Sequence, residues 1–399
     1  GPVQTTAEEP AQTDEKGPAQ TAERGPARTG EASGGARAHD RGEIVSSFLS
    51  FRSASAAVIK DGGDDPDATD GVSIIVHASF RPFSSADAPD SATPELTGPS
   101  GWRPVFVRGY PNPVFLYAGP GIGWATLPGL PMPPGEPAIN PQPRKQIAAA
   151  ACEAAARNAY GGAIYLYISV PEGVERARRT LTGRLGIVGG ISILGTRGTV
   201  RPYSHEAWKS AIEQGIRVAS ASGCPALLFS TGRRSERALL GLYPSLPAHA
   251  GVQAADFAAF SLRSAAALPF SRIAWGCFAG KLLKLAQGLE WTHAKSAAAD
   301  IPLLAKLWKE RGGAEETAKD IAAMPTASGA FSVMLHASPD LHNAVLASLA
   351  DSAGRVLLGW LLAERHGMAA PHPLPRLVLH VFSLQGNLLL THEPKLENN

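Results

Sequence analysis

Strand-like and helix-like stretches alternate along the second half of this chain. Short apolar runs, typical of buried strands, stand at 226–230 and 272–277, and each is followed by a helical stretch, near 235–242 and 280–288. Consecutive parallel strands need a long crossover, usually a helix, to bring the chain back to the same edge. The alternation therefore predicts βαβ units and a parallel sheet in an α/β domain spanning 203–399. Further elements expected there are helices at 205–222, 258–267, 300–311 and 341–365, an extended piece near 251–257 and a C-terminal hairpin around Gln385-Gly386.

Residues 44–202 show a mixed pattern of strands and one long helix. The helix is expected to start near Pro143 and to stop at Gly161-Gly162, because proline favours the first helical turn and glycine the position after the last. The pattern predicts an α+β domain. Its strands are expected at 56–60, 72–80, 104–108, 113–117 and 163–170.

The first 33 residues of the N-terminal segment, 1–43, form an octapeptide repeat that reads PVQTTAEE, PAQTDEKG, PAQTAERG, PARTGEAS. Such a polar sequence cannot bury enough apolar surface to offset the entropy of ordering it. We therefore expect a disordered tail, and we expect the chain to begin inside a longer parent protein.

Charge and cysteine content indicate which partners and which cellular compartment to expect for this protein. With 37 basic and 35 acidic residues the net charge is +2, so a nucleic-acid partner is not expected. The three cysteines, Cys152, Cys224 and Cys277, form no CxxC pair, which favours reduced thiols in the cytoplasm. The sequence shows no apolar run that approaches the ~18 residues of a membrane span and no signal peptide, so no membrane partner is expected.

A glycine-rich stretch, GRLGIVGGISILGTRG, begins at Gly183 in what otherwise resembles a buried strand. Glycine weakens a strand unless something must approach the backbone closely. The spacing of Gly186, Gly189 and Gly190 matches neither a P-loop nor a GxGxxG fingerprint, so phosphate binding is not expected. Two explanations stay open: a flat or bulky ligand lies against bare backbone, or strands pack tightly there.

The stretch GPGIGWATLPGLPMPPGEPAINPQPRKQ, 119–146, starts like a dinucleotide fingerprint. Prolines follow where the Rossmann motif needs a helix, so that context is absent. Seven prolines between 128 and 143 predict a stiff, extended wall that ends at Arg144-Lys145. It lines a site or forms a crossover between domains.

The acidic stretch KDGGDDPDATDG, 60–71, suggests a metal loop at first sight. An EF-hand needs glycine at its sixth position and glutamate at its twelfth, but counting from Asp65 these are Asp70 and Val76. Calcium is thus excluded, no metal is expected, and a turn whose aspartates bond nearby backbone N–H groups is favoured. Asp61 is kept as a candidate catalytic group.

Two further stretches, STGRRSE at 230–236 and GKLLKLAQGLEWTH at 280–293, follow the predicted parallel strands. In open α/β sheets ligands bind beyond the carboxyl ends of the strands, and helix N-termini there attract anions. His293 is a second candidate catalytic group, although a solvated or capping histidine is the more common case. Candidate cofactor-binding residues at this edge are Ser230, Thr231, Gly232, Gly276 and Lys281.

Taken together, VIKDGGDDPDATDG, GLPMPPGEPAINPQPRK, RLGIVGGISILGTRGTVRPYS and KLAQG resemble the CbiD family, the cobalt-precorrin-5B C-1-methyltransferases of anaerobic cobalamin biosynthesis. The resemblance runs in order from about 56 to 388, and STGRRSE and KLAQG look most like the proteobacterial branch. It implies an α+β N-terminal module followed by a smaller α/β domain with a short parallel sheet.

The resemblance further implies S-adenosylmethionine as methyl donor and a tetrapyrrole acceptor, with cobalt present only as part of that substrate. The acceptor's carboxylates need cationic partners, for which arginine is well suited. Each arginine alone is more commonly a solvated surface charge. The substrate-binding candidates are Arg144, Arg184, Gly186, Gly189, Gly190, Thr196 and Arg201, and Arg197, Arg233 and Arg234 also flank these stretches.

The chain departs from the family pattern in three places. The usual opening Thr-Thr-Gly turn and Cys- and Ala-rich helix have no counterpart, Asp70 replaces the usual histidine, and Leu181-Thr182-Gly183 replaces the usual Asn-Pro. Two alternatives to the corrinoid methyltransferase therefore stay open: an enzyme on the same scaffold that transforms another small molecule, and a non-catalytic tetrapyrrole-binding or scaffold protein.

Overall fold

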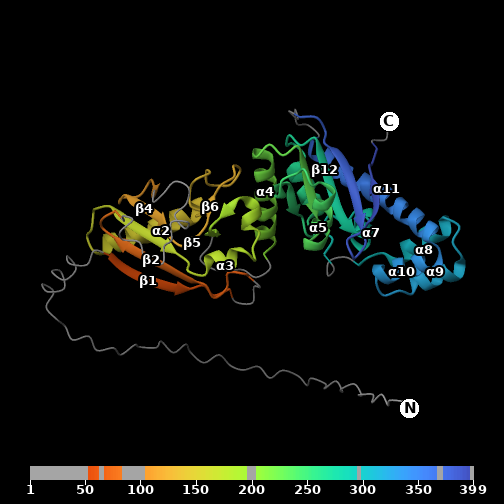
Figure 1. The fold of residues 1–399 in the computed structure, drawn as a ribbon, viewed down its shortest axis with the longest axis horizontal. Coiled ribbons are helices and arrows are strands. Elements are labelled where there is room, and N and C mark those ends of the chain that lie inside the picture. Colours follow the sequence, from red (N-terminus) through yellow and green to blue (C-terminus); the bar gives the residue numbers. More distant parts are fainter. Residues whose placement is uncertain are drawn as a thin grey trace, which may run out of the picture. The chain divides into compact units, whose positions relative to one another are not determined.

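The computed structural model describes residues 53–62, 67–82, 104–195, 204–293, 298–365 and 372–395 (Figure 1). The predicted tail, 1–43, lies outside these residues. The described residues form two five-stranded sheets with helices, which confirms the mixed α+β and α/β architecture.

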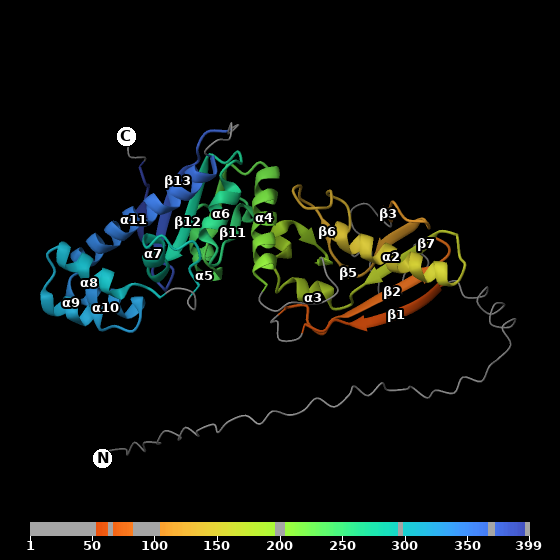
Figure 2. The same cartoon turned by 180° about the vertical axis from the view of Figure 1, so that it is seen from behind.

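The first sheet has the strand order β1-β2-β7-β4-β3. Its neighbours pair antiparallel except for β4 and β7, which run parallel and are connected through helix α2. Alanines and Cys152 of α2 pack on inward-facing residues of β3, β4 and β7, so the helix covers one face of the sheet (Figures 1 and 2). The elements are β1 (Ser53–Ile59), β2 (Ser73–Ser79), β3 (Val105–Val107), β4 (Val114–Ala118), β7 (Ile164–Ser169) and α2 (Pro141–Arg157).

The predicted strands of this sheet agree with the structure to within three residues at each end, but the helix is displaced. α2 begins two residues before Pro143 and ends at Arg157, before the predicted stop at Gly161. The chain leaves the helix early because Ala159 adopts a left-handed backbone conformation (φ 51°).

The structure corrects the expectation for the glycine-rich stretch, which does not form one buried strand. It forms a short 3₁₀ helix, η3 (Thr182–Leu185), and two two-residue strands, β8 (Ile187–Val188) and β9 (Gly190–Ile191). Gly186 and Gly189 have positive φ angles of 72° and 81°, which turn the chain between these pieces. β8 pairs antiparallel with β6 (Trp124–Ala125), and β9 pairs parallel with β5 (Gly121–Ile122).

Backbone packing explains the glycines at the β5–β9 pair. A Cβ atom on Gly190 would lie 2.2 Å from the Gly121 carbonyl oxygen, and one on Gly121 would lie 1.7 Å from the Val170 carbonyl oxygen. Gly173, at the start of α3 (Gly173–Ala177), meets the Gly121 oxygen in the same way, at 2.1 Å. Of the two explanations that the sequence left open, the structure supports tight packing of the chain against itself.

The second sheet has the order β11-β10-β12-β13-β14, in which the first four strands are parallel and β14 is antiparallel. This confirms the predicted parallel sheet and C-terminal hairpin. The strands are β10 (Ala226–Ser230), β11 (Gly251–Gln253), β12 (Arg272–Phe278), β13 (Arg376–Phe382) and β14 (Leu388–His392). The helices are α4 (His205–Ala221), α5 (Arg233–Leu242), α6 (Ala258–Ala265), α7 (Ala279–Ala286), α8 (Ile301–Glu310), α9 (Glu315–Ala322), α10 (Ala327–Ala337) and α11 (Pro339–Arg365), with a 3₁₀ turn η4 (Ala248–Ala250).

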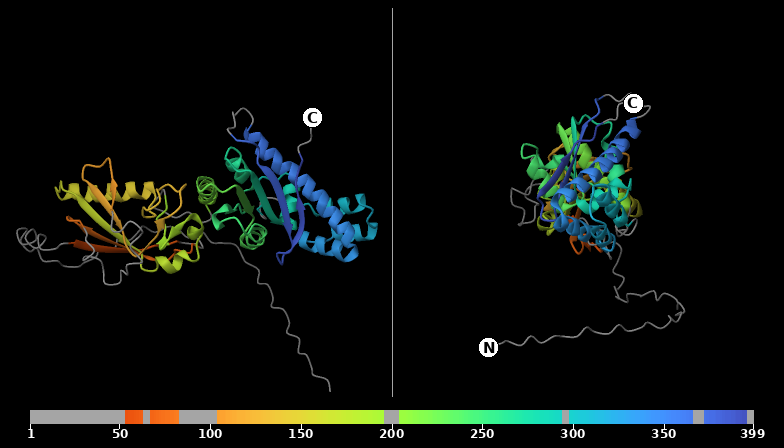
Figure 3. Two further views of the ribbon diagram at one scale, coloured as in Figure 1. Left: turned by 45° about the horizontal axis from the view of Figure 1, so that its top comes forward. Right: turned by 90° about the vertical axis from the view of Figure 1, so that its right-hand side faces the viewer.

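The helices divide between the two faces of this sheet. Leu239 of α5 packs with Leu228, Ala274 and Val378 on one face, whereas α4, α6, α7 and α11 contribute to the large core on the other. Figure 3 shows the long blue helix α11 lying along the sheet. The connection from β10 to β11 therefore passes over one face, and the connection from β12 to β13 passes over the opposite face. The direction of winding reverses between β10 and β12, which is where a ligand crevice is expected in such a sheet.

Helix α11 bears on the expectation that the chain has no apolar run long enough to span a membrane. By length and composition alone it could cross a membrane, but 56% of its most apolar stretch is buried inside the protein. Its buried residues, among them Val345, Leu349 and Leu357, belong to the large core. We interpret α11 as a core helix.

Candidate functional site

Two helices begin at the carboxyl edge of the second sheet, on either side of the winding reversal. β10 ends at Ser230 and α5 starts at Arg233, while β12 ends at Phe278 and α7 starts at the next residue. Neither helix has a side-chain cap on its first N–H groups. Free N–H groups and the positive end of the helix dipole make this edge attractive to a negatively charged group.

Ser230 is the buried polar side chain at this edge. It is 0% exposed, and within the described part of the chain its hydroxyl has no hydrogen-bond partner. It lies opposite Gly276 in the pairing of β10 with β12. A buried hydroxyl without a partner costs about 1–3 kcal/mol, so its presence points to a ligand or water that satisfies it.

Gly232, the residue before α5, leaves space at this edge. Its backbone is extended, with φ 162° and ψ 177°, and no atom lies within 4 Å of the place where a Cβ would be. A side chain or a ligand atom can occupy that position without displacing protein.

An ion pair crosses the carboxyl end of β10. Asp256 follows β11, Lys281 stands in the first turn of α7 after β12, and β10 lies between these two strands. The Lys281 ammonium also donates to the carbonyl oxygen of Thr292 at 2.9 Å and to its hydroxyl at 3.2 Å. Sequence reasoning selected Lys281 but missed Asp256, which stands in no sequence motif. Its local mark, the left-handed backbone of Ala255 before it (φ 49°), is visible only in the structure.

A second lysine holds the segment that carries His293. Lys284, which is buried, donates to the Thr292 carbonyl at 3.1 Å and to the His293 carbonyl at 3.4 Å. Burial and the neighbouring Lys281 lower its pKa. The His293 ring stacks on Trp291, with ring centres 5.3 Å apart. The structure thus brings Lys281 and His293 to one edge through Thr292.

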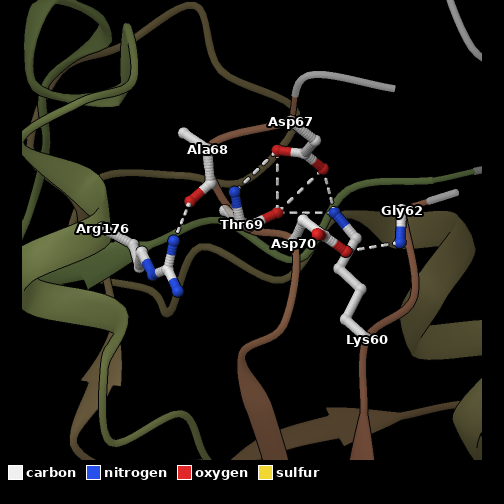
Figure 4. A network of polar contacts seen from close by, with 7 residues as sticks. All are labelled: Lys60, Gly62, Asp67, Ala68, Thr69, Asp70 and Arg176. Carbon is white, nitrogen blue, oxygen red and sulfur yellow. Dashed lines mark hydrogen bonds and ion pairs between the residues drawn. The ribbon is translucent and has the colours of Figure 1, made fainter. Parts of the chain in front are cut away.

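The described residues of the acidic stretch, 60–62 and 67–71, lie between β1 and β2 and make the predicted side-chain bonds to backbone N–H groups (Figure 4). Asp70 accepts a hydrogen bond from the Gly62 N–H at 2.7 Å, and Asp67 accepts one from the Thr69 N–H at 2.8 Å. Lys60 pairs with the Asp67 carboxylate and donates to the Thr69 hydroxyl. Asp61, the other candidate catalytic group, lies in this loop and not at the edge that carries His293.

Comparisons with known proteins match two parts of the chain to one family. The model of the CbiD family matches residues 41–202, and that of the CbiD C-terminal domain matches 291–366. The cobalt-precorrin-5B C(1)-methyltransferase of Nitratidesulfovibrio vulgaris is 45% identical over 338 residues, which are 84% of this chain and 77% of that protein. The chain belongs to the CbiD family.

Other CbiD proteins align less closely. The cobalt-precorrin-5B C(1)-methyltransferase of Geobacillus sp. (strain WCH70) is 39% identical over 285 residues, 71% of this chain and 70% of that one. A crystal structure of the cobalamin biosynthesis protein CbiD from Archaeoglobus fulgidus matches 58% of this chain and 62% of that chain, at 23% identity and a TM-score of 0.24. At so low a score, the fold described above rests on this chain alone.

Two departures from the CbiD pattern have structural partners of their own. Asp70, in place of the family histidine, closes the acidic loop through the Gly62 N–H. Thr182, in the replaced Asn-Pro position, is buried and shares a hydrogen bond of 2.6 Å with the Thr180 hydroxyl. Both substitutions are thus accommodated locally.

Several candidate arginines are already engaged within the protein. Arg144 donates to the Glu136 carboxylate at 2.6 Å and to the Ile139 carbonyl at 2.7 Å, so it ties α2 to the proline-rich wall. Arg184 pairs with the buried carboxylate of Glu236 in α5. Arg233 donates to the Arg179 carbonyl at 3.4 Å, and Arg234 lies over the ring of Phe278.

Three candidates, Thr196, Arg197 and Arg201, lie outside the described residues. Within the described ranges, no group of three or more His, Cys, Asp or Glu residues is arranged to hold a metal ion. The three cysteines are buried and unpaired.

The acidic loop leads to a prediction about pH. Burial alone would raise the pKa of Asp67, but hydrogen bonds from Lys60 and Thr69 outweigh it and lower the pKa below the ordinary value of 3.8. The ionised carboxylate therefore stabilises the fold at higher pH, and that contribution is lost as the pH falls through the folded-state pKa. We expect the Tm difference between wild type and Asp67→Asn to be largest near neutral pH and to shrink below 3.8.

Thermal unfolding over this pH range measures the difference, and Glu175→Gln serves as the control because its pair with Arg178 is exposed. A gap for Asp67→Asn that stays constant with pH would contradict the account.

Proposed function

We propose that this chain catalyses methylation of carbon C-1 of cobalt-precorrin-5B, with S-adenosylmethionine as donor. One observation carries the assignment: the 45% identity to a cobalt-precorrin-5B C(1)-methyltransferase over 77% of that relative's length. The acceptor is a tetrapyrrole whose cobalt is part of the substrate. The three buried, unpaired cysteines suit a reaction in the cytoplasm.

The donor binds, in this proposal, at the carboxyl edge of the second sheet. The groups at this edge fit S-adenosylmethionine. They are two uncapped helix N-termini for its carboxylate, a Ser230 hydroxyl without a hydrogen-bond partner among the described residues, and open space beside Gly232. Thr231, Gly276 and Lys281 complete the edge. When bound, S-adenosylmethionine supplies a methyl group on a positively charged sulfur.

The protein's own tasks in such a reaction are to orient, to exclude water and to accept a proton. Carbon methylation needs no protein nucleophile, and holding two reactants in line supplies about 7–11 kcal/mol. The ring gains a positive charge when its carbon takes the methyl group, and it regains neutrality by releasing a proton. We assign the acceptance of that proton to His293, because the two lysines hold its segment at the donor edge. Asp61 is the alternative.

The acceptor site is proposed along the glycine-rich stretch, at Gly186, Gly189 and Thr196, and at Arg201 beyond it. Gly189 and the adjacent Val188 are exposed, whereas Gly190 is enclosed by the chain itself. Arg144 and Arg184 would contribute only if they exchanged their present carboxylate partners for those of the macrocycle.

The experiment that tests this function is calorimetric titration of the full chain with S-adenosylhomocysteine, with and without a cobalt-corrinoid. Micromolar binding of S-adenosylhomocysteine and of the corrinoid is the expected result. Binding of S-adenosylhomocysteine alone would point to a different acceptor on the same scaffold. Failure of both to bind would leave a scaffold role and refute the methyltransferase.

Substitution of Gly232 by aspartate tests the position of the donor. We expect S-adenosylhomocysteine to bind about tenfold more weakly, because the new carboxylate lies beside the donor's carboxylate. Folding should be unaffected, since the position is open.

Gly241→Asp is the matched control, because Gly241 is equally open but lies near the other end of α5. Equal affinities for the two variants would place the donor elsewhere.

A further inference from the structure

The Asp256–Lys281 ion pair has the charges needed to recognise a zwitterion. The two side chains are only partly buried, at 23% and 27% exposure, and they stand at the edge where α7 begins. The amino-acid end of S-adenosylmethionine carries an ammonium and a carboxylate on one carbon. We propose that Asp256 binds this ammonium and Lys281 this carboxylate, so that the protein's own ion pair opens and each partner takes one end of the ligand. The inference rests on the proposed function and extends it to residue roles.

Both partners keep other contacts if the pair opens. The Asp256 carboxylate accepts a hydrogen bond from the Thr292 hydroxyl at 3.0 Å, through its Oδ1 atom. The carboxylate has a second oxygen, Oδ2, with which it can accept a hydrogen bond from a ligand ammonium. Lys281 likewise keeps the carbonyl and hydroxyl of Thr292. Neither charge is left unsatisfied during the exchange.

The backbone around Asp256 is built to hold its carboxylate in place. Ala255 adopts a left-handed conformation that a residue other than glycine rarely takes. The Thr292 N–H donates to the Asp256 carbonyl at 3.0 Å, which links the turn after β11 to the segment after α7. A strained residue and a long-range hydrogen bond thus set the position of one carboxylate at the ligand edge.

A third charge favours a ligand carboxylate at this place. Lys284 stands one turn after Lys281 on α7, and burial and Lys281 both oppose its charge. Two lysines thus stand beside one carboxylate, that of Asp256, and the N-terminus of α7 adds a partial positive charge. When Asp256 turns to the ligand's ammonium, the remaining positive charge attracts the ligand's carboxylate.

The test is calorimetric titration of the full chain with three probes. They are S-adenosylhomocysteine, the same molecule without its α-amino group, and 5′-methylthioadenosine, which lacks the amino-acid end. For Asp256→Asn we expect at least about a tenfold loss of affinity for S-adenosylhomocysteine and no change for 5′-methylthioadenosine. Glu290→Gln, which removes a nearby exposed ion pair with Arg263, should change neither affinity.

Part of the test uses the wild-type protein alone and compares its affinity for the probes with and without the α-amino group. Removal of the α-amino group from the probe should weaken its binding to wild type about tenfold, and should not weaken binding to Asp256→Asn further. If wild type binds both probes equally, or if Asp256→Asn keeps full affinity, the zwitterion assignment is overturned while the donor site stands. If wild type binds neither S-adenosylhomocysteine nor 5′-methylthioadenosine, the proposed function fails with it.

Discussion

Replacement of Gly190 by valine is expected to destabilise the protein by more than about 3 kcal/mol, or to prevent folding of the region around β9. The reason is a rigid contact: a Cβ at this position would lie 2.2 Å from the Gly121 carbonyl oxygen and 2.8 Å from the Gly123 nitrogen. Both atoms are backbone, and Gly121 is itself packed against Val170, so nothing can move aside cheaply. Thermal and urea unfolding measure the loss.

The same stretch offers a matched control for this substitution. Gly183 has no atom within 4 Å of its would-be Cβ. Gly183→Ala should therefore leave the Tm within a few degrees of wild type. If Gly190→Val were as stable as Gly183→Ala, the packing explanation for the glycines would be wrong.

Arg184→Ala is expected to lower the free energy of unfolding by about 2–3 kcal/mol. The Glu236 side chain is only 3% exposed, and within the described part of the chain it is bonded by Arg184 and by the Gln253 amide at 2.8 Å. Removal of the arginine leaves a buried charge with a single neutral partner, and breaking a buried pair costs about 3–5 kcal/mol. The lower figure is expected here because the Arg184 side chain is 35% exposed and solvent partly screens it.

Arg178→Ala is the control for this second substitution. Arg178 pairs with Glu175 on the surface, where the two side chains are 74% and 59% exposed, so its loss should change stability by less than about 0.5 kcal/mol. A double variant, Arg184→Ala with Glu236→Gln, should recover part of the lost stability because it removes the uncompensated charge. No recovery would mean that Arg184 acts through packing and not through its charge.

For Arg184→Ala, an effect on protein stability must be separated from an effect on ligand binding. Arg184 was selected from the sequence for a substrate carboxylate, yet in the structure it joins η3 to α5, the helix whose N-terminus lies at the proposed donor edge. Donor affinity of Arg184→Ala should therefore be measured well below its Tm, so that loss of fold is not read as loss of contact.

The sequence by itself determined most of the regular elements and the family, but it did not reveal α9, α10 or the broken form of the glycine-rich stretch. The parallel strands β10 and β12 are short apolar runs followed by helices, and burial on both faces requires that pattern wherever such a sheet forms. The acidic loop was predictable for a similar local reason. Asp67 and Asp70 bond backbone groups within eight residues of themselves, so their geometry is largely contained in the stretch.

Only the tertiary structure decided the rest, because the deciding contacts join residues far apart in the chain. Gly190 must be glycine on account of Gly121, and Arg184 is engaged on account of Glu236. Asp256 is part of no sequence motif. It became a candidate ligand-binding residue only because it pairs with Lys281, which follows 25 residues later and lies on the other side of strand β10. The hydrophobic periodicity of a sequence predicts which face of a helix or strand is buried. It does not predict which backbone atoms or charged side chains from distant parts of the chain pack against that face.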